Sequence, residues 1–437
     1  MTDFQALYRE LDPLEPVAAD DQLVYVDWQR QLDPVGGDVK SLLVREFVRD
    51  ASPERPIVRL LTGHKGSGKT TELNRVSARL RSGGAGRKIF VSTLFAQNWL
   101  DLEDIQPEDL VLQTVRQLVA DLSDTGIDLG RQQLKTFLGS IWDRLKGTQL
   151  DKVDVGLDPL KFSFALESFP TARKEFREVL RGRLPTVFDL VNGELLPAAR
   201  RQLRESHGYE DVLLIVDDLD KIPQKVVAGA RLTNHENLFL DNAATLRAIS
   251  CSKLLTVPIE LAYSPAQGRL RDDYGASLFT VPLVPIAQRD GRPIEAGEAA
   301  LIEILGRRVQ RALADAPADP ATCAGTLFDG RELLLRVVRL SGGHVRGLLV
   351  MMRGLLNMVD ELPIGAATVD RYVGRTGKDL GRALFAADRE ILRQVAATKE
   401  ATEDSRFFDL LRNQYVFAYE GEEYWYGLNP LLGEIAP

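Results

Sequence analysis

Residues 57–70, which read Ile-Val-Arg-Leu-Leu-Thr-Gly-His-Lys-Gly-Ser-Gly-Lys-Thr, decide how the rest of this 437-residue chain is interpreted. The first five residues are mainly apolar, as expected of a short buried strand. Residues 63–70 then fill every fixed position of the Walker A pattern, Gly-x4-Gly-Lys-Thr. Apolar residues recur at helical spacing over 71–81, which predicts a helix. The order of strand, glycine-rich loop and helix indicates the start of a βαβ unit.

The composition of this loop suits phosphate binding. Glycines let the backbone curl so that successive N–H groups point toward phosphate oxygens, and the helix that follows adds the positive end of its dipole. Lys69 is expected to reach the β- and γ-phosphates, and the Thr70 hydroxyl to ligate Mg²⁺. We expect His64, in the variable part of the loop, to be solvated and without a role of its own. The candidate nucleotide-binding residues are Gly63, His64, Lys65, Gly66, Ser67, Gly68, Lys69, Thr70 and Thr71.

A second motif supplies the acidic partner that a magnesium-dependent phosphate loop needs. Asp217-Asp-Leu-Asp220 directly follows the most apolar strand candidate of the chain, residues 212–216. Its first acid, Asp217, is the candidate metal residue beside Thr70, and we expect its contact with the metal to be indirect, for example through water. Asp218 stands where a longer Glu often polarises the attacking water, so we expect slow hydrolysis, with Asp218 and Asp220 as catalytic candidates. The competing interpretation is a strand that ends in a solvated acidic turn.

The alternation of strand and helix patterns predicts the fold class. Further strand candidates lie at 88–92, 253–257 and 278–283, with a short one at 23–27. Residues 151–169 alternate as a hairpin or two short strands would. This pattern predicts an α/β fold, namely a P-loop NTPase parallel sheet with helices on both faces. A helical lid and a small winged-helix-like domain are expected to follow it.

Four regions are expected along the chain. Residues 1–50 form an N-terminal segment that contributes to the nucleotide pocket, and residues 51–287 form the ATPase domain with a helical insertion at about 107–206. Strand patterns stop after Gln288, and two helical stretches, 298–313 and 330–359, indicate a lid over 288–366. The last region, 367–437, ends in a hairpin pattern and is assigned as winged-helix-like.

Composition excludes several classes of protein. The chain is 44% hydrophobic and 27% charged, as ordinary globular proteins are. Its acidic start has no signal-peptide pattern, and no apolar run approaches the roughly 18 residues of a membrane span. Its two cysteines, Cys251 and Cys323, exclude a disulfide framework and a cysteine-rich zinc site. We therefore expect a cytoplasmic protein, and its net charge of −8 disfavours non-specific nucleic-acid binding.

Three stretches together resemble the AAA+/STAND class of P-loop ATPases. They are residues 63–70 (GHKGSGKT), 213–220 (LLIVDDLD) and 341–349 (SGGHVRGLL). The nearest likeness is to bacterial STAND-like and KAP-like ATPases, with a Cdc6-like lid and winged helix. The resemblance implies ATP and Mg²⁺ as ligands. It also implies that Thr256 senses the γ-phosphate, with Ser264 as a weaker candidate, and that Arg346 reaches this phosphate from the lid.

The same resemblance implies further contacts. Arg269 or Arg271 is a candidate arginine finger for a neighbouring subunit, although Arg271 has acidic neighbours with which it can pair. Adenine contacts are expected from residues 24–27 and 39–43. Tyr25 is more readily interpreted as a packed aromatic side chain than as a platform for the base.

The resemblance implies a nucleotide-dependent switch that controls oligomerisation or a separate effector protein, with bacterial antiphage defence as one setting. The alternatives are a DNA-binding initiator or loader-like ATPase and a nucleotide-binding scaffold without hydrolysis. From Asp370 onward the chain has nine Lys and Arg against twelve Asp and Glu. This acidic balance favours protein contact over DNA contact for the C-terminal region.

Overall fold

The computed structural model describes residues 4–33, 37–133, 136–137, 170–226, 232–275, 278–313, 315–421 and 424–435. The hairpin predicted at 151–169 lies outside the described residues. Spatial clustering divides the chain into two compact units. The first contains Met1–Leu42, Thr62–Arg75 and Thr280–Pro437, and the second contains Leu43–Leu61 and Val76–Phe279. The glycine-rich loop belongs to the first unit and the acidic motif to the second.

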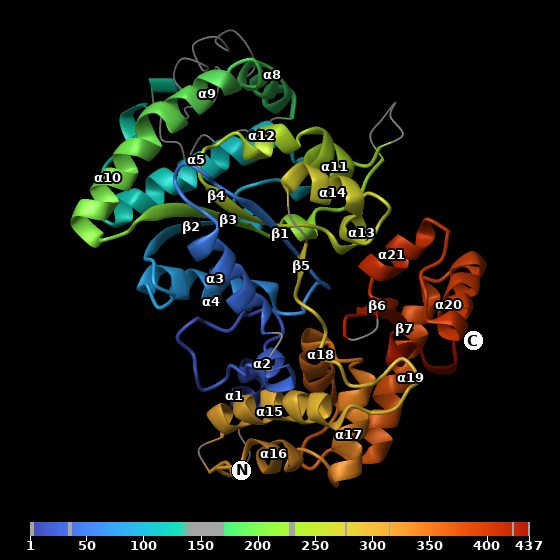
Figure 1. Cartoon of the computed structure of the whole chain (residues 1–437). Helices are drawn as coiled ribbons and strands as arrows, with labels where there is room; N and C mark the ends of the chain where they lie inside the picture. The colour runs from blue at the N-terminus through green and yellow to red at the C-terminus, as the bar shows by residue number, and fades with distance from the viewer. Residues whose placement is uncertain are drawn as a thin grey trace. The chain divides into compact units, whose positions relative to one another are not determined.

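A five-stranded sheet forms the centre of the second unit (Figure 1). Its strands lie in the order β2-β3-β4-β1-β5, and β1 pairs parallel with β4, β4 with β3, and β3 with β2. The strands are β1 (Val58–Thr62), β2 (Ile89–Phe95), β3 (Asp211–Asp217), β4 (Ser252–Thr256) and β5 (Phe279–Thr280). The predicted α/β class and parallel sheet are thus confirmed. The last strand is shorter than the 278–283 pattern predicted.

Helices cover both faces of this sheet (Figure 1). The parts of α3 and α4 that belong to this unit lie on one face, and α5 and α12 lie on the other. All seven residues of β3 are buried, as a strand covered on both faces requires. The helices of the unit are α3 (Val39–Arg49), α4 (Lys69–Ser82), α5 (Pro107–Asp124), α8 (Pro170–Arg181), α9 (Leu184–Leu190), α10 (Leu196–His207), α11 (Asn234–Glu236), α12 (Ala243–Arg247), α13 (Ile259–Ala262) and α14 (Gln267–Tyr274).

The predicted helical insertion is part of the core of this unit. Apolar side chains of α5, α8, α9 and α10 form one buried cluster with Phe90 of β2 and Val212 and Leu214 of β3. Proline at the first position of α5 and left-handed Gly208 after α10 give these two helices well-defined ends. The insertion therefore extends the sheet's core and does not form a separate domain.

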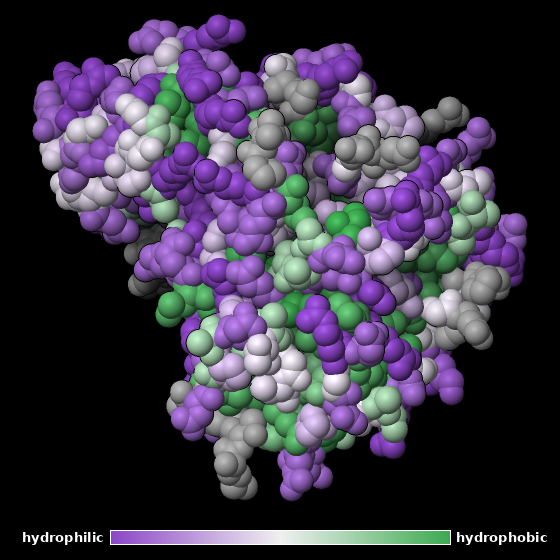
Figure 2. All heavy atoms as spheres, turned by 60° about the horizontal axis from the view of Figure 1, so that its bottom comes forward, coloured by the Kyte–Doolittle hydropathy of each residue, from purple (hydrophilic) through white to green (hydrophobic). Residues whose placement is uncertain are grey.

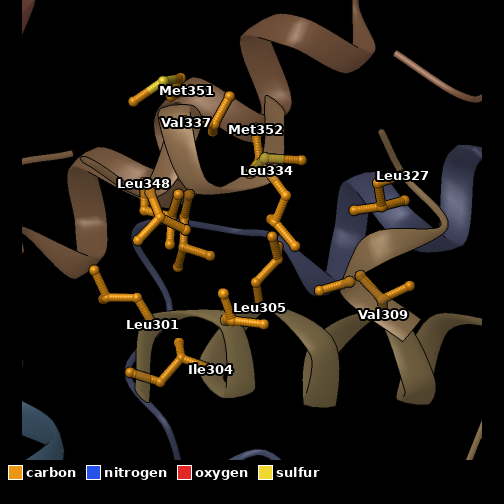
Figure 3. Packing of buried hydrophobic residues seen from close by; sticks show 14 of the residues in the cluster. Leu301, Ile304, Leu305, Val309, Leu327, Leu334, Val337, Leu348, Met351 and Met352 are labelled. Atoms are coloured by element: carbon orange, nitrogen blue, oxygen red, sulfur yellow. The ribbon is translucent and has the colours of Figure 1, made fainter. Parts of the chain in front are cut away.

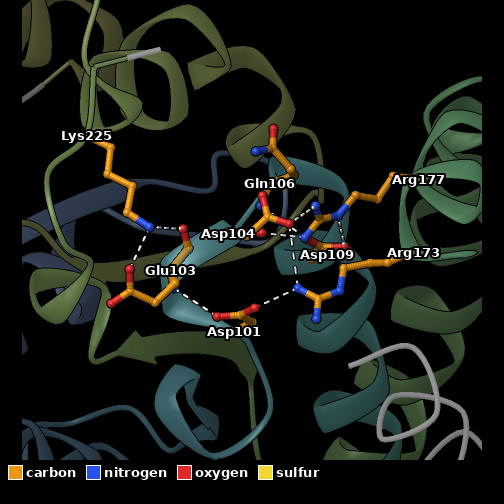
Figure 4. Close-up of polar contacts among 8 residues, drawn as sticks. All are labelled: Asp101, Glu103, Asp104, Gln106, Asp109, Arg173, Arg177 and Lys225. Carbon is orange, nitrogen blue, oxygen red and sulfur yellow. Dashed lines mark hydrogen bonds and ion pairs between the residues drawn. The ribbon is translucent and has the colours of Figure 1, made fainter. Parts of the chain in front are cut away.

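Ion pairs attach α8 to α5 and to the segment that precedes it (Figure 4). Arg173 Nη1 lies 2.7 Å from Asp101 Oδ2, and Arg177 Nη2 lies 2.6 Å from Asp109 Oδ2. The side chains of both arginines are only 11% exposed. Because these charges are paired within the unit, we assign them a structural role.

Apolar packing of the first unit joins the N-terminal helices to the predicted lid. Leu7 and Leu11, from and just after α1 (Phe4–Glu10), and Trp28 of α2 (Trp28–Leu32) share a buried cluster with the four lid helices. Figure 3 shows its centre, where leucines of the lid helices meet Met351 and Met352. The lid helices are α15 (Glu295–Ala312), α16 (Pro320–Gly325), α17 (Arg331–Leu340) and α18 (Val345–Leu356).

One prediction about this unit is confirmed and one is wrong. Residues 330–359 contain helix as predicted, in α17 and α18, which are separated by a turn where Gly342 and Gly343 have φ values of 62° and 81°. The strand predicted at 23–27 is a turn followed by irregular chain. The Asp21 side chain accepts the N–H of Val24 and stabilises that turn. Short apolar runs do not by themselves form strands, because a strand needs a partner edge.

The C-terminal region contains three helices and an antiparallel hairpin. β6 (Val416–Tyr419) pairs with β7 (Trp425–Leu428), in agreement with the predicted hairpin. Val416, Phe417, Ala418 and Tyr419 are all buried. The remaining elements are α19 (Ala366–Arg382), α20 (Ala386–Thr398), α21 (Arg406–Arg412) and the 3₁₀ segment η7 (Pro430–Ile435).

The face of the molecule drawn in Figure 2 is mostly polar. Figure 2 shows hydrophilic residues interspersed with smaller hydrophobic areas on the face that it displays. Large exposed hydrophobic side chains in the described part are scattered along the chain: Leu14, Leu23, Val226, Val350, Phe385 and Tyr424. Within the described ranges, none of the helices is both long and apolar enough to cross a bilayer.

Candidate functional site

The glycine-rich loop joins β1 to α4, as the sequence predicted. α4 begins at Lys69 and runs for 14 residues, so the positive end of its helix dipole lies at the loop. Lys69 is only 5% exposed, and its Nζ donates to the carbonyl oxygens of Gly63, at 2.8 Å, and His64, at 2.9 Å. The ammonium group is therefore held at the loop by acceptors that a phosphate can replace.

Two glycines of the loop are required by its geometry. Gly63 has φ of 142°, and a Cβ there would lie 2.5 Å from the carbonyl oxygen of Val281. Gly66 has φ of 94°, in the left-handed region that favours glycine. Ser67 Oγ is buried and has no hydrogen-bond partner among the described residues. A curled backbone, a buried cation, a helix N-terminus and an unsatisfied hydroxyl fit a phosphate group.

The lid contacts the loop directly within the first unit. His344 Nε2 donates to the carbonyl oxygen of Lys65 at 2.9 Å, and its Nδ1 accepts the N–H of Gly347 at the start of α18. Arg346, the predicted γ-phosphate residue, packs against Gly66. A Cβ at Gly66 would lie 2.7 Å from Cβ of Arg346. The structure thus places Arg346 at the loop, with its Nε donating to the carbonyl oxygen of Pro13.

The C-terminal hairpin also contacts the loop. The N–H of Ala418 in β6 donates to His64 Nε2 at 2.8 Å, and Gln414 Nε2 donates to the carbonyl oxygen of Lys65 at 2.5 Å. The Phe417 ring lies edge-on to the His64 ring, with 5.5 Å between centroids. His64 is only 3% exposed, so the expectation of a solvated side chain is wrong. Its hydrogen-bond partner Ala418 is 354 positions away, which the local sequence does not reveal.

Both histidines at the loop are held neutral. Burial, the nearby His344 and Lys69 lower the pKa of His64 well below its ordinary value. Burial lowers the pKa of His344 to about 4. The contacts agree, because each ring uses one nitrogen as an acceptor, Nε2 in His64 and Nδ1 in His344. Protonation of either acceptor nitrogen would break its hydrogen bond.

A polar cluster ties the N-terminal segment to the first turns of α4. The Tyr25 hydroxyl donates to Glu72 Oε1 at 3.1 Å, and Lys40 Nζ donates to the Tyr25 oxygen at 3.1 Å and to Asp27 Oδ1 at 2.7 Å. The Arg75 guanidinium stacks on the Tyr25 ring, 3.3 Å from its centroid. Tyr25 is therefore a packed aromatic residue, as interpreted from the sequence. Among the other predicted residues, the Thr71 hydroxyl accepts the N–H of Val17.

The acidic motif lies at the carboxyl end of β3 in the second unit. Asp217 is the last residue of the strand and is 1% exposed, so the solvated-turn interpretation fails for this side chain. Asp218 is 2% exposed, and its Oδ1 lies 2.5 Å from Lys221 Nζ. Asp220 is partly buried in the 3₁₀ turn η5 (Leu219–Lys221). Charges this deeply buried require compensation, which Lys221 supplies to Asp218.

Thr256 is the last residue of β4 and is fully buried. Its Oγ1 accepts the N–H of Leu219 at 3.0 Å, directly after Asp218. The structure therefore brings Asp217, Asp218 and Thr256 together at one end of neighbouring strands. The weaker candidate Ser264 donates to the carbonyl oxygen of Leu261.

The two candidate arginine fingers lie on α14. Arg269 Nη2 is 3.2 Å from Asp241 Oδ1, and Arg271 Nε is 3.8 Å from Asp272 Oδ1. Both side chains are more than half exposed, at 54% and 68%. Exposed pairs of this kind are weak, so each arginine remains available to a partner surface.

Sequence reasoning missed His344, Gln414, Ala418 and the Tyr25–Glu72 cluster. The His344 position had one usable signal, since it directly precedes the lid helix as a capping residue does. Within the described ranges, His, Cys, Asp and Glu residues form no group of three or more suited to hold a metal by themselves. A metal bound with a nucleotide takes some of its ligands from the phosphates, which is consistent with this finding.

Comparisons with known proteins give distant matches. No family model and no curated protein matches the chain. The ORC2 protein of Aeropyrum pernix (ADPNP-ADP complexes) matches at 14% identity and a TM-score of 0.43, covering 98% of this chain and 96% of that chain. A Walker-type ATPase of Pyrococcus abyssi gives 14% and 0.43, with 98% and 99% covered. Cdc6p from Pyrobaculum aerophilum gives 11% and 0.39, with 98% and 97% covered. The sheet order and the loop, rather than these matches, support the fold assignment.

Proposed function

We propose that the chain is an ATP-binding and slowly hydrolysing P-loop ATPase of the AAA+/STAND type, in which nucleotide at the loop controls the lid and the hairpin. Support comes from a complete Walker A loop at the carboxyl end of a parallel strand, where ligands bind in open α/β sheets. Lys69 and the backbone N–H groups of the loop are the proposed phosphate ligands. The other loop residues from Gly63 to Thr71 shape the cradle.

The remaining roles follow from the chemistry of each side chain. Thr70 and Asp217 are the proposed magnesium residues, and the metal would supply charge neutralisation for the β- and γ-phosphates. Asp218 is the proposed general base, with Asp220 as a second acid of the same turn. Thr256 and Arg346 are proposed to respond to the γ-phosphate, because a hydroxyl and a guanidinium both donate to phosphate oxygens. Asp218 is shorter than the Glu often found at this position, which supports slow hydrolysis.

One observation carries the proposal of a switch. The Lys65 carbonyl accepts from His344 of the lid and from Gln414 beside the hairpin, while His64 accepts from Ala418 of β6. Lys69 holds the carbonyls of Gly63 and His64 in the same arrangement. A phosphate that recruits Lys69 removes the bonds from Lys69 to the carbonyls of Gly63 and His64. It therefore changes the conformation of the loop segment to which the lid and the hairpin are hydrogen-bonded. Differential contact of this kind is what biases a two-state arrangement.

Hydrogen exchange of the full-length protein tests this proposal. The amide of Ala418 is protected by its bond to His64, so we expect its exchange rate to change when Mg-ATP is added and to stay unchanged in Lys69→Ala. Calorimetry with the same samples reports nucleotide binding. Binding without any exchange response at 342–346 or 416–419 would leave an ATP-binding protein and remove the switch. Absence of binding would remove both.

The proposed output is oligomerisation or control of a separate effector protein, because the sequence shows no obvious nuclease, protease or TIR-like motif. Antiphage defence is the setting that the sequence resemblance implies. An Asp218→Asn variant is expected to retain ATP and to accumulate the ATP-bound assembly. Light scattering of this variant with and without Mg-ATP measures self-association, and a monomer under both conditions would direct the search to a different partner chain.

Duplex DNA binding, the alternative from the same resemblance, is opposed by the charges of α21. Arg406 pairs with Asp404 at 2.5 Å and Arg412 with Asp409 at 2.8 Å, so each arginine at the ends of this helix has an acidic neighbour. Phosphate binding relies on an excess of cations, whereas the region from Asp370 onward has nine Lys and Arg against twelve Asp and Glu. A gel shift at low salt with micromolar protein distinguishes the two functions. A complex that weakens steeply with added salt would favour the DNA-binding alternative.

A further inference from the structure

The turn that carries Asp218 has an uncommon backbone conformation. Asp218 has φ of 70°, in the left-handed region. Aspartate adopts this region more readily than most non-glycine residues, because its short side chain can bond to the local backbone. Asp218 Oδ2 is buried and has no hydrogen-bond partner within the described part of the chain. The conformation of the proposed base therefore depends on contacts that neighbouring elements make with the turn.

One side of the turn is held by β4. The Leu219 N–H donates to Thr256 Oγ1 at 3.0 Å, and the Lys221 N–H donates to the carbonyl oxygen of Asp218 at 3.0 Å. Together these bonds hold the first half of the turn. In the second half the Ile222 N–H donates to the Leu219 carbonyl oxygen at 3.4 Å, and Ile222 makes a further contact through its own carbonyl oxygen.

That contact is made by a buried histidine. His235, in α11, is 1% exposed, and its Nε2 lies 3.0 Å from the carbonyl oxygen of Ile222, the residue after η5. A carbonyl oxygen only accepts, so Nε2 carries the proton and donates. His235 Nδ1 lies 3.8 Å from Glu260 Oε1, and Glu260 on α13 is 3% exposed. This separation is longer than a hydrogen bond, so the carboxylate acts on the imidazole through its charge alone.

The contacts hold two residues of the turn that follows Asp218, Leu219 and Ile222. Glu260 follows Thr256 by four residues, so both restraints on the turn originate at the end of β4. Thr256 restrains Leu219 directly, and Glu260 restrains Ile222 through His235. We infer that His235 and Glu260 are positioning residues that hold Asp218 in the geometry required for activating water. This inference rests on the proposed function, in which Asp218 is the general base.

Packing alone does not explain this pair. Neighbouring residues of the same segments, such as Leu238, Phe239 and Leu261, are apolar and fill one buried cluster. A buried ionisable pair costs desolvation free energy, and apolar side chains of similar volume often give equal or greater stability. A histidine and a glutamate at these positions therefore indicate a directional role, which the bond to the Ile222 carbonyl supplies.

The test compares variants of the full-length protein in ATP binding by calorimetry and in phosphate release. His235→Leu removes the donor to Ile222, whereas His235→Gln keeps an amide N–H near the position of Nε2. We expect kcat of His235→Leu to fall about 10- to 100-fold, the scale associated with small misplacements of catalytic groups. The dissociation constant of ATP should stay within about 2-fold, because an interaction made only in the transition state alters kcat. His235→Gln should recover most of the loss.

Two further variants keep the test decisive. Glu260→Gln preserves volume and isolates the charge, so it should lower kcat even if His235→Leu does not fold. His207→Leu, at the end of α10 in the same unit, is the matched control and should retain the wild-type kcat. Equal kcat values in all variants, or losses in kcat and ATP affinity that follow lost thermal stability, would overturn the inference.

The wild-type measurements separate this inference from the proposed function. Wild-type protein that binds ATP without releasing phosphate would also overturn the inference, while nucleotide binding would stand. Wild-type protein that binds no ATP would overturn the proposed function before any variant is compared. A lower kcat with unchanged ATP binding, restored by His235→Gln, is the result that supports the positioning role.

Discussion

Glu72 gives the chain a pH-dependent stability near neutrality. This side chain, in the first turn of α4, is 7% exposed and accepts the Tyr25 hydroxyl. Burial raises its pKa from 4.5 to about 7, with Lys40 and Tyr25 acting in the opposite direction and the charges of Asp27 and Asp38 adding to the increase. Neutral Glu72 is therefore the form that the fold favours.

The sign and size of the effect follow from this change in pKa. A carboxyl group with a raised folded pKa has its stabilising contribution fully present below the unfolded pKa of 4.5 and loses it as pH rises through 7. At 1.36 kcal/mol per pKa unit, ionisation of Glu72 costs the fold about 3 kcal/mol. For a domain of 150–250 residues this corresponds to roughly 6–12 °C in the unfolding midpoint.

Glu72→Gln removes the titration and keeps the shape of the side chain and an acceptor for Tyr25. We expect the midpoints of wild type and variant, measured by calorimetry from pH 5 to pH 8.5, to lie close together at pH 5. They should separate as pH rises, with the variant about 6–12 °C more stable above pH 8. Glu46→Gln, on α3, is the control, because its carboxylate is about 31% exposed and pairs with Arg59.

Parallel curves for wild type and Glu72→Gln across this range would refute the reasoning. Such a result would mean that Lys40 and Arg75 compensate the buried charge fully. A variant less stable than wild type at high pH would show that ionised Glu72 stabilises the cluster, which reverses the sign.

Three other variants test the contacts around the loop and the acidic turn. Gly66→Ala adds a methyl group in the left-handed region against Arg346, so we expect the calorimetric midpoint to fall by about 2–8 °C from 1–2 kcal/mol of strain. Thr256→Val leaves the Leu219 N–H without its acceptor, costing about 1–3 kcal/mol, and should lower phosphate release more than Thr256→Ser, which keeps the hydroxyl. His344→Gln should remove an acid-induced loss of stability. The folded pKa of His344 is lowered from 6.5 to about 4, so its contribution to folding stability is fully present above pH 6.5. That contribution is lost as pH falls through the folded pKa of about 4.

Local pattern was sufficient for the sheet. The strand β3 and the loop after β1 were predictable because adjacent residues specify each of them. An apolar run that ends in an acid marks β3, and an apolar run followed by glycines marks β1 and its loop. The short segment at 23–27 has a similar apolar content and was predicted wrongly. Its outcome depends on whether a partner strand lies beside it, which neighbours in sequence do not determine.

The contacts of His64 show why the rest of the candidate site escaped sequence analysis. A histidine in a glycine-rich loop is solvated unless another element covers it, and here the cover comes from β6, 354 residues later. The partners of His64 are the backbone N–H of Ala418 and the ring of Phe417. Both groups are common in any sequence, so neither residue can be recognised as a contact from the sequence. Such contacts follow from topology, because the chain after β5 builds the lid and hairpin in the same compact unit as the loop.

The loop is formed by adjacent residues but is bonded by distant ones, and this affects how the protein would respond to nucleotide. The residues proposed to bind phosphate are specified locally, whereas those that bond the loop in the described structure come from the lid and the hairpin. Exchange of one Lys69 bond for a phosphate contact changes the same short loop to which His344 and Ala418 donate. The net contribution of a hydrogen bond to stability is about 0.5–1.5 kcal/mol. Loss of the three bonds from His344, Gln414 and Ala418 would therefore destabilise the arrangement in which lid and hairpin are bonded to the loop by roughly 1.5–4.5 kcal/mol. A coupling of this size lies within the usual range of allosteric free energies and at its upper end exceeds it, which is sufficient for a switch without any change in the sheet.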